Sequence, residues 1–120
     1  MKLNSKETRG VAVVEIHGKL LGGAGESEKF HKCFKAIVAD GRNSAVVNLH
    51  GTSYSNSLGI GMLIGAHTSI KSAGGELVLA NVADRINSIL VVTQLALIFK
   101  TFESVDEAVD YLLEANANAA

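Results

Sequence analysis

The sequence predicts a single α/β domain with a mostly parallel β-sheet. After an opening hairpin, strand-like and helix-like patterns alternate to the end of the chain. The strand-like runs are short, apolar and rich in β-branched residues, and the helix-like runs carry apolar residues at three- and four-residue spacing. Together these observations predict a mixed sheet of about five strands with about four helices.

The hairpin occupies the start of the chain. Residues 11–17 are a β-branched run between Gly10 and Gly18, which predicts a strand. A shorter strand is expected before it, at residues 2–6, and a turn at residues 8–10 joins the two strands. Residues 18–25 hold four glycines and predict an irregular loop.

Three helices and two buried strands are expected in alternation through the middle of the chain. The helices span residues 26–39, 57–72 and 83–92, and the strands span residues 45–49 and 77–80. Right-handed crossovers between parallel strands place ligands and partners near the carboxyl ends of the strands. The first helix has an apolar stripe made of Phe30, Cys33, Phe34, Ile37 and Val38.

The C-terminal part predicts a short edge strand at residues 98–102 and a last helix. Ser104 is the expected N-cap of that helix, and Glu107 completes a capping box with it. We expect residues 1–115 to form the domain and residues 116–120 to form a disordered tail.

The composition argues for a small cytoplasmic protein that binds neither nucleic acid nor membrane. The chain has 120 residues and a net charge of −1, with no basic run of the kind that binds nucleic acid. Its single cysteine, Cys33, excludes an internal disulfide and suits a reducing cytoplasm. No signal peptide is expected, and the longest apolar stretches are far below the roughly 20 residues that span a bilayer.

No enzyme chemistry, cofactor or metal site is expected. Ser57 has no His and Asp partners in the relation that nucleophilic catalysis requires, and no glycine-rich phosphate loop follows a strand. Four histidines are present, but they form no close ligand pair and join no carboxylate pattern: His17, His31, His50 and His67.

Ser57 is the most informative single residue because it lies where a turn meets the start of a helix. A hydroxyl there faces the positive end of the helix dipole, with free backbone N–H groups nearby. Two interpretations are open at this point: Ser57 is the N-cap of the helix, or it is a site that carries a phosphate.

Residues 46–61, which read Val-Val-Asn-Leu-His-Gly-Thr-Ser-Tyr-Ser-Asn-Ser-Leu-Gly-Ile-Gly, closely resemble the STAS domain of the anti-sigma factor antagonist family. The family signature is an apolar strand, a turn, and Asp or Asn, Ser, Ser or Thr, and Gly at a helix start. Residues 71–82 resemble the family's glycine pair and following strand. Residues 95–99 and 102–108 are similar to its closing strand and helix, so the likeness spans nearly the whole chain.

The resemblance implies partner switching without catalysis by this chain. In this family the unphosphorylated protein binds an anti-sigma factor, usually an ATP-dependent serine kinase, and thereby frees a sigma factor. The kinase phosphorylates the serine after the Asp or Asn, and a phosphatase resets the switch. Carried over, Ser57 is the phosphoacceptor, and the loop after the second strand and the start of the second long helix bind the partner: Leu20, Leu21, Gly22, Asn56, Leu58, Gly59, Ile60 and Gly61.

The chain departs from the family pattern at several positions, which motivates an alternative. Asn56 stands where many members have Asp, and Leu58 replaces the usual Ser or Thr. Lys19 and Leu21 stand where an acidic residue is common. The alternative is an interaction module without phosphorylation control, either a scaffold in a signalling complex or an accessory subunit of a lipid transporter.

Overall fold

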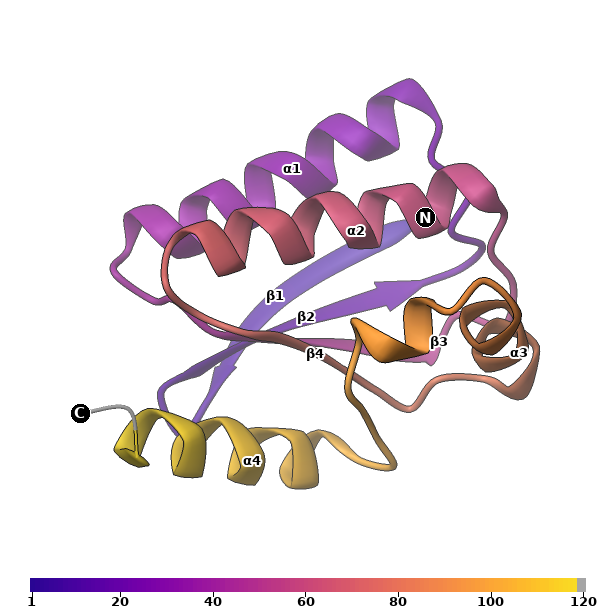
Figure 1. Cartoon of the computed structure of the whole chain (residues 1–120). Coiled ribbons are helices and arrows are strands. Elements are labelled where there is room, and N and C mark those ends of the chain that lie inside the picture. The colour runs from indigo at the N-terminus through magenta and orange to yellow at the C-terminus, as the bar shows by residue number, and fades with distance from the viewer. Residues whose placement is uncertain (119–120) are drawn as a thin grey trace.

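The computed structural model describes residues 1–118 as one α/β domain, which confirms the predicted fold class. Within this range, five strands form one sheet, and four α-helices and a 3₁₀ turn complete the domain. Figure 1 shows α1 and α2 side by side on one face of the sheet and α4 on the other. The elements are β1 (Lys2–Thr8), β2 (Val11–His17), α1 (Ala24–Ala39), β3 (Ala45–Gly51), α2 (Ser57–Ser72), β4 (Leu77–Ala80), α3 (Asp84–Val92), η1 (Leu95–Leu97), β5 (Thr101–Phe102) and α4 (Val105–Asn118).

The strands lie in chain order, β1-β2-β3-β4-β5. The β1–β2 pair is antiparallel, and β2, β3, β4 and β5 run parallel to one another. Arg9 and Gly10 join β1 to β2 and both have positive φ, 51° and 85°, which matches the twist of a tight hairpin turn. Because each parallel strand is added on the same side, right-handed crossovers bring α1, α2 and α3 to one face of the sheet.

The two faces of the sheet have separate apolar cores because side chains alternate along each strand. One core lies under α1, α2 and α3, and the other lies under α4. The first includes Val14, Val47, Leu79, Phe34, Leu63 and Leu90, and the second includes Val13, Val46, Val78, Ala108, Val109 and Leu112.

Polar contacts hold the N-terminal end and the middle of α4. The predicted cap is present, since the Ser104 hydroxyl accepts from the Glu107 N–H at 3.1 Å. The Glu107 carboxylate accepts from the Glu103 N–H at 3.3 Å, one residue before the position that a capping box uses. Further along the helix, the Tyr111 hydroxyl accepts from the Lys100 ammonium at 2.6 Å, and this hydrogen bond raises the pKa of Lys100.

The structure corrects the predicted edge strand. Only Thr101–Phe102 pair with β4, so the prediction of a strand over residues 98–102 is wrong for its first three residues. Leu95–Leu97 form a 3₁₀ turn, and Phe99 is buried in the core beneath it. An apolar segment that packs into the core from a turn has the same composition as a short strand. The sequence pattern therefore predicted a strand here. Apart from the end of α4, the other element ends differ from prediction by two residues or fewer.

The end of the chain is described only in part. α4 runs to Asn118, into the segment where a disordered tail was expected, and residues 119–120 of that tail lie outside the described residues. None of the helices in the described range has the length and apolar character needed to cross a bilayer.

Two adjacent leucines of α4 test how this helix is attached. Leu112 is fully buried against the sheet, whereas Leu113 is 37% exposed. We expect Leu112→Ala to lower the free energy of unfolding by about 2–5 kcal/mol, because the substitution leaves a cavity. Leu113→Ala is the matched control and is expected to cost less than about 1 kcal/mol. Urea unfolding followed by circular dichroism measures both, and equal losses would contradict this packing of α4.

Candidate functional site

The loops that follow β2 and β3 are joined by backbone hydrogen bonds. The Gly18 N–H donates to the Gly51 carbonyl at 3.0 Å, and the Leu20 N–H donates to the Tyr54 carbonyl at 3.0 Å. Leu20 and Ser55 form an isolated parallel bridge. The first part of the glycine-rich loop therefore continues the pairing of the sheet. Composition alone does not reveal this pairing.

Two buried hydroxyls reinforce this junction. The Thr52 hydroxyl donates to the Ile16 carbonyl at 3.0 Å, and the Ser55 hydroxyl donates to the Leu20 carbonyl at 3.0 Å. Both residues are nearly inaccessible to solvent. A buried hydroxyl that satisfies a backbone carbonyl holds a loop more firmly than an apolar contact alone. Thr52 and Ser55 thus give the start of α2 a rigid base.

Asn56, not Ser57, is the N-cap of α2. Its side-chain oxygen accepts from the Gly59 N–H at 2.9 Å, and its own backbone is extended, with φ −112° and ψ −176°. The interpretation of Ser57 as the cap is therefore wrong. Ser57 is the first helical residue and is exposed, and within residues 1–118 its hydroxyl makes no hydrogen bond. Because Asn56 performs the capping, the Ser57 hydroxyl is left available for chemistry.

The stretch of chain that contains Ser57 carries no charged residue. Residues 43–70 contain no Asp, Glu, Lys or Arg, and the first turn of α2 has no acidic group. The neighbouring Leu58 side chain is 64% exposed. Ser57 therefore combines the positive end of a helix dipole with an exposed apolar neighbour.

The structure separates the predicted partner-binding residues into two sets. Leu21, Leu58 and Gly61 are exposed, and Gly22 and Asn56 are half-buried. The other three are buried, so the expectation that they lie at the surface is wrong: Leu20, Gly59 and Ile60. Leu20 and Ile60 fill the core below the loops.

Close packing accounts for two of the glycines at this site. A Cβ on Gly59 would lie 2.0 Å from the Leu20 carbonyl oxygen, so only glycine lets α2 rest on that loop. Gly22 has φ of +72°, and a Cβ there would lie 2.6 Å from the Leu58 Cβ. In contrast, a Cβ on Gly61 or Gly65 would meet nothing within 4 Å. Internal packing thus explains Gly59 but not the two exposed glycines.

A groove of about 640 Å³ lies between α1 and α2, with Ser57 and Leu58 at one end. Phe30 and Phe34 of α1 and Met62 of α2 form part of its apolar lining. Ser27, His31 and Thr68 are among its few polar residues. The helices therefore leave an open, mostly apolar depression beside the candidate phosphoacceptor.

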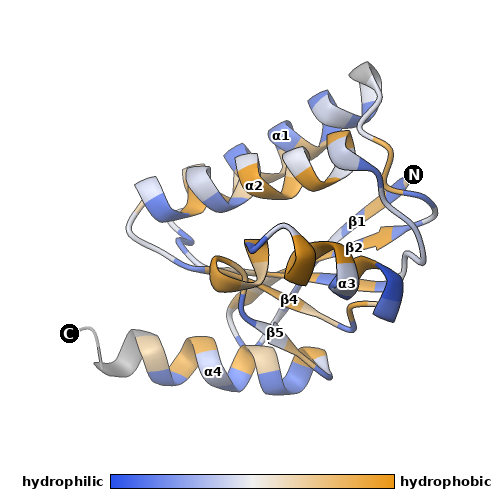
Figure 2. Ribbon diagram, turned by 45° about the vertical axis from the view of Figure 1, so that its right-hand side comes forward, coloured by the Kyte–Doolittle hydropathy of each residue, from blue (hydrophilic) through white to orange (hydrophobic). Residues whose placement is uncertain are grey.

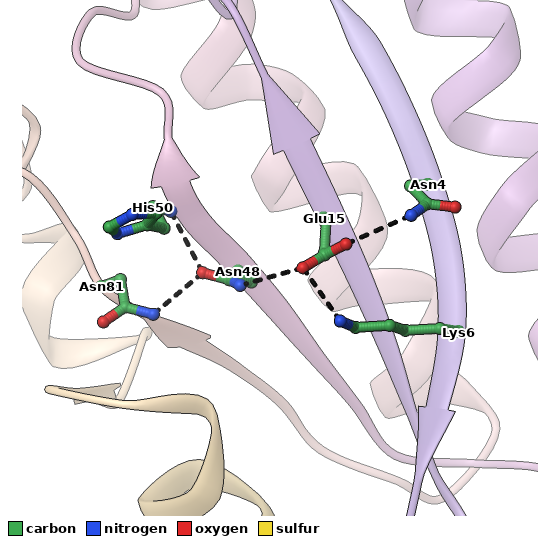
Figure 3. A network of polar contacts seen from close by, with 6 residues as sticks. All are labelled: Asn4, Lys6, Glu15, Asn48, His50 and Asn81. Atoms are coloured by element: carbon green, nitrogen blue, oxygen red, sulfur yellow. Dashed lines mark hydrogen bonds and ion pairs between the residues drawn. The ribbon is translucent and has the colours of Figure 1, made fainter.

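A second polar cluster crosses the sheet on the face that α4 covers only in part (Figure 3). Glu15 forms an ion pair with Lys6 at 3.2 Å and accepts from Asn4, and the hydrogen bond from Lys6 lowers the pKa of Glu15. Asn48 donates to Glu15 at 3.5 Å and accepts from Asn81 at 2.9 Å. The polar groups of the cluster form hydrogen bonds with one another across neighbouring strands. The cluster is therefore a structural network at the edge of the apolar core on this face.

The histidines belong to no cluster of metal-ligating side chains in the part of the chain that the structure describes. Within residues 1–118, no three His, Cys, Asp or Glu side chains lie close enough together to hold an ion. His67 packs its ring edge-on against Phe99, with centroids 5.4 Å apart, and burial lowers its pKa. This histidine is part of the packing between α2 and the segment after η1.

The fold and the site define a small α/β domain in which two joined loops support an exposed helix N-terminus. Residues 2–108 match the model of the STAS domain family, and the chain therefore belongs to this family. The resemblance stated from the sequence is thus confirmed.

Solved structures with the same fold come from several kinds of protein. A proposed anti-sigma factor antagonist from Thermotoga maritima has a TM-score of 0.81 at 22% identity, covering 92% of this chain and 93% of its own. The phosphorylated Bacillus protein SpoIIAA has a TM-score of 0.70 at 18% identity, covering 92% and 98%. A sulfate transporter family protein from Wolinella succinogenes has a TM-score of 0.75 at 18% identity, covering 88% and 86%.

Two glycine substitutions in α2 test whether the helix packs against the loop at Leu20. Gly61→Ala is expected to raise the free energy of unfolding by about 0.5–1 kcal/mol, because alanine favours the helix and the added methyl group enters open space. Gly59→Ala is expected to lower it by about 1–3 kcal/mol, because its methyl group overlaps the Leu20 carbonyl. Thermal and urea unfolding measure both variants. Stabilisation by Gly59→Ala would show that α2 does not rest on the loop.

Substitution of Asn56 tests its role as the cap. Asn56→Ala is expected to lower the free energy of unfolding by about 1 kcal/mol, through loss of the hydrogen bond to the Gly59 N–H. Asn56→Asp is the control, because it keeps the acceptor and adds a charge that the helix dipole favours. Ser57→Ala should change the stability much less than Asn56→Ala. A larger loss for Ser57→Ala would return the capping role to the serine.

Proposed function

We propose that this chain is an anti-sigma factor antagonist whose binding is switched off by phosphorylation of Ser57. It binds a serine-kinase anti-sigma factor in the cytoplasm and thereby frees a sigma factor, and a phosphatase restores the unphosphorylated form. The single observation that carries this proposal is that the neighbouring residues Asn56 and Ser57 have different roles. Asn56 caps α2, and the Ser57 hydroxyl is exposed at the first helical position.

Accessibility favours Ser57 over the other serines near it. A protein kinase must reach the hydroxyl with its own active site, so the acceptor has to lie at the surface. Ser55 is 2% exposed and is committed to the Leu20 carbonyl. Ser53 is exposed but lies within the loop, away from the helix terminus that favours a phosphate. Ser57 alone among these three has both properties.

A phosphate on Ser57 would change what this surface can bind. It adds about 1.5 to 2 negative charges directly beside the apolar Leu58 side chain. A partner that covers Leu58 in the unphosphorylated form would have to desolvate that charge. The helix dipole supports the phosphate within this chain, so the cost falls on the complex and not on the fold.

The comparisons support this proposal at the level of the fold. Two of the solved structures with this fold are those of SpoIIAA, an anti-sigma factor antagonist, in an unphosphorylated and a phosphorylated form. The fold thus accommodates a phosphorylated member.

A second candidate function is a STAS interaction module without phosphorylation control. It would serve as a scaffold in a signalling complex or as an accessory subunit of a lipid transporter. The observation that favours it is the exposed apolar side chain of Leu58 in a stretch of chain without charged residues, which suits a permanent interface. In this case Ser57 is an interface residue and carries no phosphate.

Phosphorylation and binding assays with the serine-kinase anti-sigma factor of the same organism test the proposal. With ATP, mass spectrometry should map phosphate to Ser57, and Ser57→Ala should abolish it. Ser57→Asp should weaken binding of the kinase at least about tenfold, or about 1.4 kcal/mol, because the charge lies in the interface. Calorimetry or surface plasmon resonance measures this loss.

Ser53→Ala is the matched control, since it removes an exposed hydroxyl from the same loop and helix region. It should leave both phosphorylation and binding unchanged. Phosphate on Ser53 instead of Ser57, or equal binding by wild type and Ser57→Asp, would reject the switch. Tight binding to the kinase without any phosphate on Ser57 would favour the second candidate.

A further inference from the structure

His67 lies in the packing between α2 and the segment that follows α3. Its ring contacts the ring of Phe99, with centroids 5.4 Å apart and an angle of 69° between the ring planes. Among the described residues, the Nδ1 atom of His67 is the one buried side-chain nitrogen or oxygen that has no hydrogen-bond partner. A buried polar atom without a partner costs free energy, so packing alone does not account for a histidine at this position.

Phe99 anchors residues 93–99 to the domain, and we call these residues the η1 segment. Phe99 is 2% exposed and lies in the core under α1, α2 and α3, and Leu95 packs partly against that core. Leu97 and Ile98 are exposed instead. Figure 2 shows strongly hydrophobic colouring over much of α3 and the segment after it. A segment with so few buried side chains belongs to the least stable part of a fold and is suited to local opening.

The backbone of the η1 segment forms its hydrogen bonds locally. The Ile98 and Phe99 N–H groups both donate to the Leu95 carbonyl, at 2.9 and 3.1 Å. These bonds shape the turn but do not attach it to α2. Attachment to α2 therefore depends on side chains, and Phe99 is the one whose ring contacts His67.

Burial is the main influence on the protonation of His67, and it lowers the pKa of this histidine. The Lys71 ammonium, one turn later on α2, lowers that pKa further. Residues 86–99, which include the η1 segment, contain no Asp, Glu, Lys, Arg or His. No charge on α2 or on the η1 segment therefore favours a protonated ring.

Glu76 and Lys100 are the charged residues that come directly before β4 and directly after Phe99 in the chain. The Glu76 carboxylate raises the pKa of His67, but less than burial and Lys71 lower it. Both Glu76 oxygens accept from the Tyr111 hydroxyl, at 2.9 and 2.8 Å, and the Lys100 ammonium donates to the same hydroxyl at 2.6 Å. Glu76 therefore supplies no acceptor to the buried Nδ1.

We propose that His67 is a pH-sensitive latch, which holds the η1 segment against α2 while its ring is neutral and releases the segment when its ring is protonated. A neutral imidazole carries one N–H, which can lie on Nε2 and leave only a lone pair on the buried Nδ1. The imidazolium carries an N–H on both nitrogens, so protonation places a donor at Nδ1, where no acceptor is present. Opening of the η1 segment lets water solvate that N–H group and its charge.

The closed segment loses stability as the pH falls, because the neutral ring is the form that packs. In the open segment the pKa of His67 returns to its usual value of about 6.5, and in the closed form it is lower. The stability of the closed form is therefore complete above about pH 6.5 and is lost progressively below it. The latch is independent of the proposed phosphorylation of Ser57, which lies at the start of α2.

Hydrogen exchange of the full chain between about pH 7.5 and about pH 5, corrected for the intrinsic rate at each pH, tests the latch. The Ile98 and Phe99 amides report the opening, because both donate within the η1 segment. Their protection should fall at least about threefold, and at most about thirtyfold, which is the limit for one histidine that stays neutral while closed. At the lower pH they should exchange well before the amides of β3, because the opening is local.

His67→Phe is the test variant, because phenylalanine keeps a ring against Phe99 and takes up no proton. The protection of the Ile98 and Phe99 amides should then be the same across this pH range. His67→Leu is a second variant without a titrating group, for the case that the larger ring disturbs the packing. His31→Phe is the matched control, since it removes an exposed histidine of α1 and should keep the acid response of the wild type.

Titration of the His67 ring by NMR gives a second reading. The ring should titrate below the value of about 6.5 that is usual for histidine, with the proton of the neutral form on Nε2. A ring that titrates at or above that value overturns the inference, as does an acid response that both His67 variants retain. Exchange of the Ile98 and Phe99 amides together with those of β3 would overturn it too. None of these outcomes depends on whether Ser57 accepts a phosphate.

Discussion

The contact between Leu20 and the first turn of α2 is the constraint on which the candidate site depends. The Leu20 side chain is fully buried, and its carbonyl accepts from the Ser55 hydroxyl at 3.0 Å and from the Asn56 N–H at 3.4 Å. Gly59 rests on the same carbonyl, where no other residue fits. One peptide group thus positions the end of one loop, the cap of α2 and its first turn. Without it, Ser57 would stand on a mobile loop end rather than on a held helix terminus.

The contact between Leu20 and α2 explains why some residues of the site are buried and others are exposed. Apolar side chains that point down, Leu20 and Ile60, secure the loops to the core. Those that point out, Leu21 and Leu58, are exposed to solvent. In the sequence, the buried and the exposed apolar residues lie within a few positions of one another and are of the same residue types. A motif therefore identifies where the surface lies, but the packing decides which of its residues are at the surface.

Most of the fold follows from sequence pattern, because β2 and β4 are short apolar runs with clear ends and α1 has an apolar stripe at helical spacing. The pattern failed where an apolar residue serves the core from a turn, as Phe99 does. At the site, the motif was sufficient to single out Ser57. It was not sufficient to assign the cap, since Asn and Ser are nearly equal as N-caps and only the backbone geometry of Asn56 decides between them. Contacts across the chain, such as the bridge from Leu20 to Ser55, have no local signal in either segment.

The absence of charged residues from the chain segment around Ser57 bears on how a phosphate would act there. A phosphate can order a segment by pairing with arginines, or it can disrupt an interface by repulsion and desolvation. Residues 43–70 offer no Arg or Lys to pair with, so α2 provides no new ion pair for a phosphate. The backbone N–H groups and dipole of α2 hold the charge in place without rearrangement of the chain. In the proposed switch, the phosphate would therefore exclude the partner from this surface without a rearrangement of the folded domain.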